Sequence, residues 1–346
     1  MKVLGIADFR QNKIKYPLEQ SGVDSRVITS ENILRNPVTA IGSINRIIAT
    51  IKDYNPDAIL VNGDSLLCFI VLILGQIYQT PVIVRLGGDV WKTRHKKQHE
   101  TFKNGEYLKS VGYFFLRLMR RITFRLSTGF IVVSNHLVKN VLDNTHLGPN
   151  SIEVVPVPLD SKFDANPGRS SNQNTCSFRL LTVTNLRYYE KYTALKQALP
   201  IIVSFMQEFP TVKYRIAGGG QYHSELLDYI QDLDVGEDVK SRIECPGYIK
   251  SIKDVYEKSD VFIYISQIDG YPNVVIEAQS SALPVIVNEF EATQDQITHL
   301  ESGILVDSPG DDDISKWLKI LYEHTDLRER IGDNAQIIAQ ERNSPS

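Results

Sequence analysis

The amino-acid sequence predicts an α/β protein made of two doubly wound, Rossmann-like domains. Short runs rich in Val and Ile recur without strict alternation, which is typical of strands buried on both faces of a parallel sheet. Helical stretches with short connections separate them. The 346 residues suffice for about two domains, and a segment dense in Ser, Asn, Asp, Gly and Pro predicts a linker over 158–175. We therefore expect domains over 1–157 and 176–346, with the ligand in the cleft between them.

The first half consists of alternating strands and helices. Its predicted strands are Lys2–Ala7, Ser25–Thr29, Asp57–Val61, Pro81–Leu86, Gly129–Ser134 and Ile152–Val155. Its predicted helices cover 43–54, 65–78, 106–127 and 135–144. Repeated units of this kind build an open, mostly parallel sheet.

The same rhythm restarts after the linker and predicts a second sheet. The strands expected there are Arg179–Thr184, Lys213–Ala217, Asp260–Ser266, Pro284–Asn288 and Gly303–Val306. The helices expected there cover 192–208, 222–232, 251–258, 273–282, 312–324 and 326–340. Because proline lacks an N–H and clashes with the preceding turn, Pro200 is expected to kink or break its helix.

Composition and charge exclude several classes of protein. The cysteines, Cys68, Cys176 and Cys245, are odd in number and far apart, which excludes a disulfide scaffold and favours a reducing compartment such as the cytoplasm. Residues 1–170 hold 22 Lys and Arg against 14 Asp and Glu, but the formal net charge of the chain is −3, which argues against nucleic-acid binding. No secretory signal peptide is expected from the N-terminal residues, and the longest apolar run, 66–75, is about half the length of a membrane span.

The segment Ser266–Ala278 combines a strand end, a Gly-Pro turn and a helix start. Asp269 is expected at the carboxyl end of the strand, where doubly wound sheets bind ligands. The helix is expected to begin near Asn273, and the free N–H groups of Asn273, Val274 and Val275 would favour a phosphate group.

Glu277 lies one helical turn after Asn273, so Asp269 and Glu277 can both approach one hydroxyl-rich ligand. The alternative interpretation is structural. In that case Asp269 only terminates the turn, and Glu277 is a solvated helix residue.

Asp269 and Glu277, with GYPNVV between them, resemble the E-x7-E motif of retaining GT-B glycosyltransferases in the glycosyl transferases group 1 family. Further segments resemble the same family: Leu181–Tyr192 (a strand before a phosphate-binding Lys), Ile216–Gly220 (a strand and glycine turn), Glu244–Ser266 (strand, Gly, helix, strand), and Phe130–Ser134 with Val154–Asp160. The resemblance is specific over about 175–310 and weaker before it. It implies a GT-B fold, in which two Rossmann-like domains face each other across a cleft.

The resemblance also implies roles for the matching residues. Glu277 would accept hydrogen bonds from the nucleotide ribose, Asp269 would meet the donor sugar, and Lys191 would neutralise the diphosphate leaving group. Sugar hydroxyls and diphosphate would be held by Gly270 and the amides of Tyr271, Asn273, Val274 and Val275. Since a fixed ammonium and a helix N-terminus stabilise the departing negative charge without a metal, no metal or other cofactor is expected.

Several positions depart from the family pattern. Asn185 stands where the family often has an Arg, with Arg187 near enough to substitute, and Tyr248 is a weaker candidate for lining the nucleobase pocket. The first strand leads into 7–10 (Ala-Asp-Phe-Arg) in place of a Gly-Gly loop. The family's terminal helix, which crosses back to the first domain, is expected to be short or missing before the end ERNSPS.

Gly87 occupies the position of a His that faces the reaction centre in many members of the family. Asp89 is then the best local candidate for a catalytic contact with the acceptor hydroxyl or donor sugar, with Arg85 as its neighbour. The alternative is that Gly-Gly-Asp after a strand is an ordinary turn.

The segment 92–125 is strongly basic, with ten Lys and Arg against Glu100 and Glu106. Its predicted helix places four arginines on one face, Arg117, Arg120, Arg121 and Arg125, and apolar residues on the opposite side, Val111, Phe115, Leu118 and Ile122. We expect the apolar side to pack on the sheet and the basic side to face solvent. The basic side could attract anionic lipid headgroups at the inner membrane face, which suits a lipid-linked acceptor.

Three other motifs are interpreted structurally. Asp311–Asp313 resembles an Asp-x-Asp metal motif but precedes a helix, where acidic residues are stabilised by the macrodipole. His95 and His99 lack a third ligand, so no zinc site is expected. Gly218–Gly220 is no GxGxxG motif.

The sequence leaves three functions open. The first is a retaining glycosyltransferase that moves a hexose from a UDP- or GDP-sugar to a hydroxyl of a glycan or lipid-linked glycan. The second is a sugar-nucleotide epimerase of the same architecture, for which no acid/base pair stands out. The third is a non-catalytic GT-B scaffold, which the missing His and Gly-Gly loop keep open.

Overall fold

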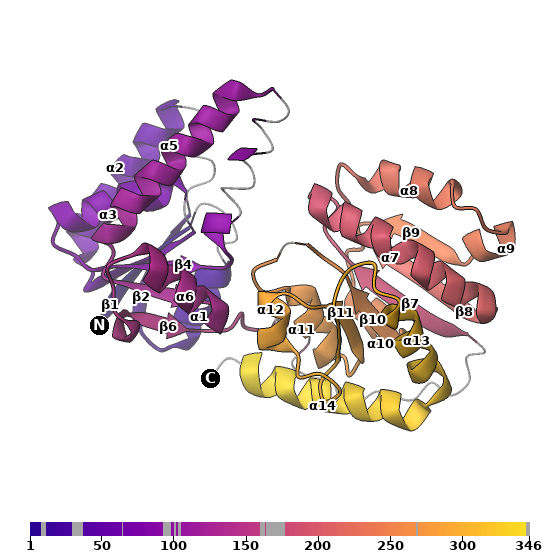
Figure 1. Cartoon of the computed structure of the whole chain (residues 1–346). Helices are drawn as coiled ribbons and strands as arrows, with labels where there is room; N and C mark the ends of the chain where they lie inside the picture. Colours follow the sequence, from indigo (N-terminus) through magenta and orange to yellow (C-terminus); the bar gives the residue numbers. More distant parts are fainter. Residues whose placement is uncertain are drawn as a thin grey trace. The chain divides into compact units, whose positions relative to one another are not determined.

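The chain folds into two compact units, shown in Figure 1, one comprising Met1–Pro158 and the other beginning at Leu159. The structure is a computed structural model that describes residues 1–7, 12–29, 37–63, 65–92, 98–99, 102, 105–159, 163, 177–267 and 269–343. Most of the predicted linker lies outside these residues. Leu159 and Phe163, which fall within the predicted linker, contact the second unit. The Leu159 amide donates to the Asn343 carbonyl (2.9 Å), and the buried Phe163 ring packs edge-on against Tyr256.

The first unit contains a six-stranded, fully parallel sheet in the order β2-β1-β3-β4-β5-β6. Its strands are β1 (Lys2–Ala7), β2 (Asp24–Thr29), β3 (Ala58–Asn62), β4 (Val82–Leu86), β5 (Gly129–Val132) and β6 (Ile152–Val154). The six strands confirm the sequence prediction within a few residues at each end. Apolar side chains such as Leu4, Ile59 and Val84 are fully buried, as the non-alternating pattern predicts.

The helices of the first unit are α1 (Asn12–Gln20), α2 (Pro37–Tyr54), α3 (Leu66–Ile77), α5 (Tyr107–Thr123) and α6 (Asn135–Asn144). Short 3-10 turns cover Phe124–Leu126 and Pro149–Ser151. Helix α1 is absent from the sequence prediction because its composition is polar and Pro17 lies inside it. It nevertheless packs closely on the sheet, since a Cβ at Gly5 would lie 2.7 Å from a methyl of Ile14.

The second unit contains another parallel six-stranded sheet, in the order β12-β11-β10-β7-β8-β9. Its strands are β7 (Phe178–Val183), β8 (Val212–Ala217), β9 (Ile243–Gly247), β10 (Val261–Tyr264), β11 (Val285–Asn288) and β12 (Ile304–Val306). Five of these match strands predicted from the hydrophobic pattern. The edge strand β9 has no such run and was expected only from the family resemblance.

The helices of this unit are α7 (Tyr189–Glu208), α8 (His223–Gln231), α9 (Glu237–Lys240), α10 (Lys253–Glu257), α11 (Asn273–Ser280), α12 (Glu291–Gln296), α13 (Asp313–Glu323) and α14 (Thr325–Asn343). The long α14 packs against α11 and α13 (Figure 1). It matches the helix predicted over 326–340 and continues to Asn343. The expectation that the family's crossing helix is short or missing is not tested by the described residues.

Pro200 does not break α7, which continues through it to Glu208. The carbonyl of Lys196, four residues earlier, receives no bond from the proline. It instead accepts a hydrogen bond from the Tyr229 hydroxyl (3.4 Å), which satisfies it from outside the helix.

Helix α5 is oriented opposite to the prediction. The apolar residues expected against the sheet are exposed: Val111 is 51% exposed, Phe115 56%, Leu118 46% and Ile122 58%. The buried residues include the polar Ser110 and Arg120. Arg120 turns inward because its guanidinium donates to the Val90 carbonyl (2.6 Å) and lies over the Trp91 ring at 5.5 Å. The remaining arginines of the basic side, Arg117, Arg121 and Arg125, stay at least partly exposed.

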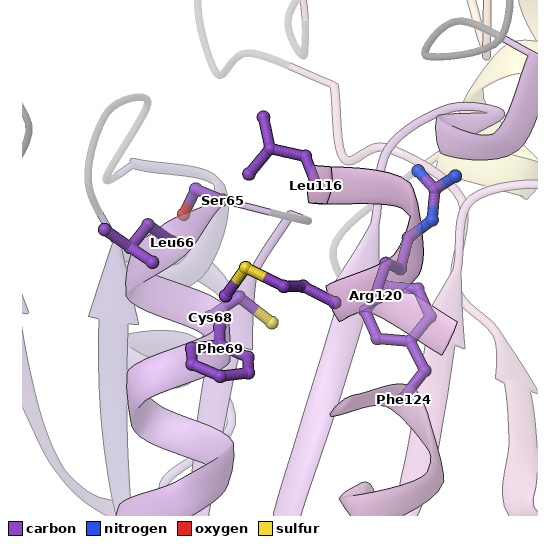
Figure 2. Close-up of a pocket in the computed structure, with 8 residues that line it drawn as sticks. Ser65, Leu66, Cys68, Phe69, Leu116, Arg120 and Phe124 are labelled. Carbon is purple, nitrogen blue, oxygen red and sulfur yellow. The ribbon is translucent and has the colours of Figure 1, made fainter. Parts of the chain in front are cut away.

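A cavity of about 20 Å³ lies between α3 and α5, as Figure 2 shows. Cys68, Phe69, Leu116 and Phe124 supply much of its lining. Its volume holds about one water molecule, so it is not a substrate site. Among the described helices, none is both long enough and apolar enough to span a bilayer.

Candidate active site

Three polar side chains meet beyond the carboxyl end of β10 in the second unit. Tyr264 is the last residue of β10, Asp269 follows it in the loop, and Lys191 comes from the first turn of α7. The Lys191 ammonium lies 2.7 Å from Oδ2 of Asp269 and donates to the Tyr264 hydroxyl at 2.9 Å. The Tyr264 hydroxyl donates to the same Oδ2 at 2.6 Å, and the Gly270 amide donates to Oδ1 at 2.8 Å. The carboxylate is thus held on both oxygens.

The electrostatics of this cluster fix its charges. Burial acts to lower the pKa of Lys191, but Tyr264 and Asp269 outweigh burial and raise that pKa above its usual value. Burial acts to raise the pKa of Asp269, but Lys191 outweighs it, so that pKa falls below its usual value. Burial raises the pKa of Tyr264, so its hydroxyl stays protonated and can donate. The cluster is therefore an ion pair near neutral pH, and its side chains remain 13% and 22% exposed for Lys191 and Asp269.

Helix α11 begins at Asn273, as predicted, and follows the capping residue Pro272. Within the described residues, the amides of Asn273 and Val274 have no hydrogen-bond partner, so two donors point out of the helix start. The prediction was wrong for Val275, whose amide donates to the Pro272 carbonyl (3.1 Å) because the first turn is tight. Tyr271 is buried and its hydroxyl bonds to Asn343 of α14, which anchors the loop.

Glu277 lies on α11 and is half-buried. Its Oε2 accepts a hydrogen bond from the Tyr256 hydroxyl at 3.1 Å, and that hydroxyl also contacts the Val274 carbonyl at 3.3 Å. Burial raises the pKa of Tyr256 well above its usual value, so this hydroxyl too is a fixed donor. Glu277 is therefore held by the core and is no freely solvated helix residue.

The rings of Tyr256 and Tyr264 both pack on Phe262, at centroid distances of 5.6 and 6.5 Å. One aromatic stack thus supports a hydroxyl donor to each of the two carboxylates, Asp269 and Glu277. Sequence analysis missed both tyrosines. The only available signal was for Tyr264, a polar hydroxyl at the last position of an otherwise apolar strand.

The loop after β7 lies against the glycine turn after β8. A Cβ at Gly218 would lie 1.8 Å from the Thr184 carbonyl oxygen, and one at Gly220 would lie 2.1 Å from the Leu186 carbonyl carbon. Both glycines have φ in the left-handed region, at +139° and +154°. Gly218–Gly220 therefore serves close backbone packing.

The two candidates in that loop behave differently. Asn185 accepts the Arg187 amide (3.1 Å) on its side chain and so shapes the turn before α7. The Arg187 side chain is exposed. Tyr248 follows β9 at the same sheet edge, and at 81% exposure its ring is open to stacking by a ligand.

In the first unit, Asp89 follows β4 and both its carboxylate oxygens are engaged. Oδ1 accepts the Lys92 amide (2.8 Å), and Oδ2 accepts the Asn140 side-chain amide of α6 (2.9 Å). These contacts favour the structural alternative, in which Asp89 organises the turn. Arg85, its expected neighbour, is buried within β4.

The Asp311–Asp313 motif matches its structural interpretation. Asp311 accepts the amides of Asp307 and Asp313, at 3.0 and 2.9 Å, just where α13 begins. His95 lies outside the described residues. In the part of the chain that is described, no three His, Cys, Asp or Glu side chains cluster as metal ligands would.

The comparisons with known proteins agree with this architecture. Residues 168–337 match the family described as "Glycosyl transferases group 1". The ORF31 protein of a virus (isolate Australia/Victoria), described as a glycosyltransferase, is 26% identical over 286 residues, which cover 83% of this chain and 76% of that protein. The capsular polysaccharide biosynthesis glycosyltransferase CapM of Staphylococcus aureus is 23% identical over 67% of this chain and 62% of its own length.

Among solved structures, HepE of Anabaena in complex with UDP matches with a TM-score of 0.73 at 16% identity, over 100% of this chain and 96% of that one. Sucrose-phosphate synthase of Thermosynechococcus elongatus matches with a TM-score of 0.74 at 13% identity, over 99% and 95%. These likenesses show the GT-B fold. The profile match over residues 168–337 assigns this part of the chain, which makes up most of the second unit, to the glycosyl transferases group 1 family.

Proposed function

We propose that the protein is a retaining glycosyltransferase that moves a hexose from a UDP- or GDP-sugar to a hydroxyl of a glycan or lipid-linked glycan. The observation that carries the proposal is the Lys191–Asp269–Tyr264 cluster, whose carboxylate lies in the loop that leads into α11. A cation, a carboxylate and unpaired amides are there gathered at the ligand-binding edge of a doubly wound sheet.

The chemistry follows from these groups. Breaking a glycosyl–phosphate bond places negative charge on the departing diphosphate, which the Lys191 ammonium and the amides of Asn273 and Val274 would stabilise. These donors are fixed before the reaction, so we propose that no metal is needed. Asp269 would orient the ammonium and meet the donor sugar, and Glu277, held by Tyr256, would accept the ribose hydroxyls.

The remaining candidates take smaller roles. Gly270 and Tyr271 shape the loop that leads into α11, and the exposed Tyr248 ring would stack on the nucleobase. Arg187, whose side chain is exposed in the loop between β7 and α7, would add positive charge near the diphosphate. Asp89 would act only by positioning the turn after β4.

The names of similar proteins support the donor and acceptor classes. HepE has been solved with UDP and with UDP-glucose. An N-acetylgalactosaminyltransferase of Campylobacter jejuni, 26% identical over 36% of this chain and 33% of its own, is named for a substrate linked to diphosphoundecaprenol.

One assay separates this proposal from its alternatives. Nucleotide release is measured from UDP- and GDP-sugars, with and without a membrane extract as the acceptor source. Release that depends on the acceptor supports a transferase, whereas conversion of the sugar without release would indicate an epimerase. Tight nucleotide binding with neither reaction would indicate a non-catalytic scaffold. The anomeric configuration of the product tests the retaining mechanism.

We further propose that the protein works in the cytoplasm and binds the inner membrane face through α5. The exposed apolar face of this helix, which includes Leu108 at 92% and Phe115 at 56% exposure, is suited to the lipid interface. The exposed Arg121 lies in the last turn of this helix and the exposed Arg125 in the 3-10 turn that follows it, and each basic residue near an anionic surface adds about 1 kcal/mol. The proposed membrane contact thus combines the basic residues expected from the sequence with the apolar face of α5.

Sedimentation with vesicles tests the membrane proposal. Wild type is expected to bind vesicles that contain phosphatidylglycerol, and Phe115→Glu should abolish binding without changing the melting temperature. Ile337→Glu is the matched control, since Ile337 is 53% exposed on α14 in the other unit. Equal binding of all three proteins would refute the proposal, and concentration-dependent dimers lost in Phe115→Glu would assign the face to a second copy instead.

A further inference from the structure

Arg85 is a buried arginine that lies one residue before the end of β4. It is 5% exposed. The Asn62 residue at the end of β3 is its register partner, and Nη1 of Arg85 lies 3.4 Å from Oδ1 of Asn62, a long hydrogen bond. This is the only side-chain acceptor that the described residues offer the guanidinium.

No carboxylate among the described residues forms an ion pair with Arg85. The half-buried Arg242, by contrast, is satisfied by the fold: its guanidinium donates to the carbonyls of Met206, Phe209 and Val212. A buried cation without a counter-charge is costly, and burial lowers the pKa of Arg85 to about 10. Such a residue is retained most readily where a ligand supplies the missing charge.

The backbone around Arg85 leaves room for a ligand. Among the described residues, a Cβ built at Gly87 would meet just one atom within 4 Å, Nη1 of Arg85 at 3.7 Å. A Cβ at Gly63, which follows β3, would meet no atom of these residues within 4 Å. Both glycines lie at the carboxyl edge of the first sheet, where doubly wound folds bind ligands.

We propose that Arg85 and Asn62 form an anion-binding subsite in the first unit, which takes a phosphate or pyrophosphate group of a substrate over Gly87. The planar guanidinium donates to two phosphate oxygens at once, and the Asn62 side-chain amide adds a third donor. The anion binding stands independently of the proposed transferase activity. The identity of the substrate that carries the phosphate rests on that activity.

Calorimetric titration of inorganic pyrophosphate into the full chain tests the subsite. Arg85→Gln is expected to remove one class of binding sites, or weaken it at least about tenfold, because a charge-assisted bidentate contact is lost. It should keep or raise the melting temperature, because an unpaired buried charge is removed. Arg242→Gln is the control, expected to lower the melting temperature without changing the pyrophosphate isotherm. An unchanged isotherm in folded Arg85→Gln overturns the proposal.

Gly87→Ala keeps the test decisive should Arg85→Gln fail to fold. The added methyl occupies the space beside Nη1 and leaves the arginine in place, so pyrophosphate binding should weaken while the fold is kept. Wild-type binding by Gly87→Ala would overturn the proposal. Kinetics then identify the source of the phosphate: a raised KM for the acceptor in Gly87→Ala assigns it to the acceptor, and a raised KM for the sugar nucleotide assigns it to the donor.

Discussion

The ion pair between Lys191 and Asp269 allows a double-mutant cycle that separates structure from catalysis. Lys191→Met removes one of three hydrogen-bond donors to the Asp269 carboxylate and leaves those of Tyr264 and the Gly270 amide. Exposed ion pairs contribute about 0–1 kcal/mol, and breaking a fully buried pair costs about 3–5 kcal/mol. With side chains 13% and 22% exposed and two donors remaining, we expect a loss of about 2 kcal/mol in the free energy of unfolding.

Asp269→Asn should cost a similar amount, because it leaves the ammonium without its counter-charge. The double variant should be more stable than the sum of the single losses predicts, with a coupling energy of about 1–2 kcal/mol. The free energies are measured by urea denaturation. Additive losses would refute the geometry of the pair.

The double variant should not regain turnover, although it regains part of the lost stability. The missing ammonium would cost about 3 kcal/mol of transition-state stabilisation, or roughly a hundredfold in kcat, in both Lys191→Met and the double variant. Lys191→Arg keeps the charge and should retain more activity than Lys191→Met. Acceptor-dependent nucleotide release measures these rates, and wild-type turnover in folded Lys191→Met would refute the assigned role of the lysine.

Three further predictions concern donor binding, the glycine turn and pH. Glu277→Ala should weaken UDP binding, measured by calorimetry, at least about tenfold. Tyr256→Phe removes only the hydrogen bond that holds the Glu277 carboxylate, so it should weaken UDP binding less. Equal UDP affinity of Glu277→Ala and wild type would show that Glu277 does not bind the ribose. Gly220→Ala should lower the free energy of unfolding by about 3 kcal/mol or more, because its Cβ would lie 2.1 Å from main-chain carbon, whereas Gly219→Ala, whose nearest contact is at 3.6 Å, should be tolerated. The ion pair between Lys191 and Asp269 contributes its full stabilisation between about pH 4 and pH 10. Below that range the contribution is lost as the pH falls through the lowered pKa of Asp269, and above it the contribution is lost as the pH rises through the raised pKa of Lys191. The pH–rate profile should therefore show no limb from this pair between about pH 5 and 9, and a limb in that window that disappears in Lys191→Met would contradict the charge assignment.

Sequence patterns predicted most of the architecture because buried parallel strands and amphipathic helices leave strong periodic signals. The predictions failed where that signal is weak. Helix α1 is polar and contains Pro17, and the edge strand β9 lacks a continuous apolar run. The orientation of α5 was wrong for a different reason: periodicity identifies two faces but not which of them meets the protein.

The candidate site shows the same division. The spacing of Asp269 and Glu277, with a Gly-Pro turn between them, determined by itself that two carboxylates and a helix start share one sheet edge. Only the tertiary structure paired Asp269 with Lys191, 78 residues away, and gave each carboxylate a buried tyrosine hydroxyl. It alone also buried Arg85 where no carboxylate of the described residues pairs with it. The reason is physical: local sequence sets backbone conformation and burial, whereas electrostatic partners come from segments that meet only when the sheet is assembled.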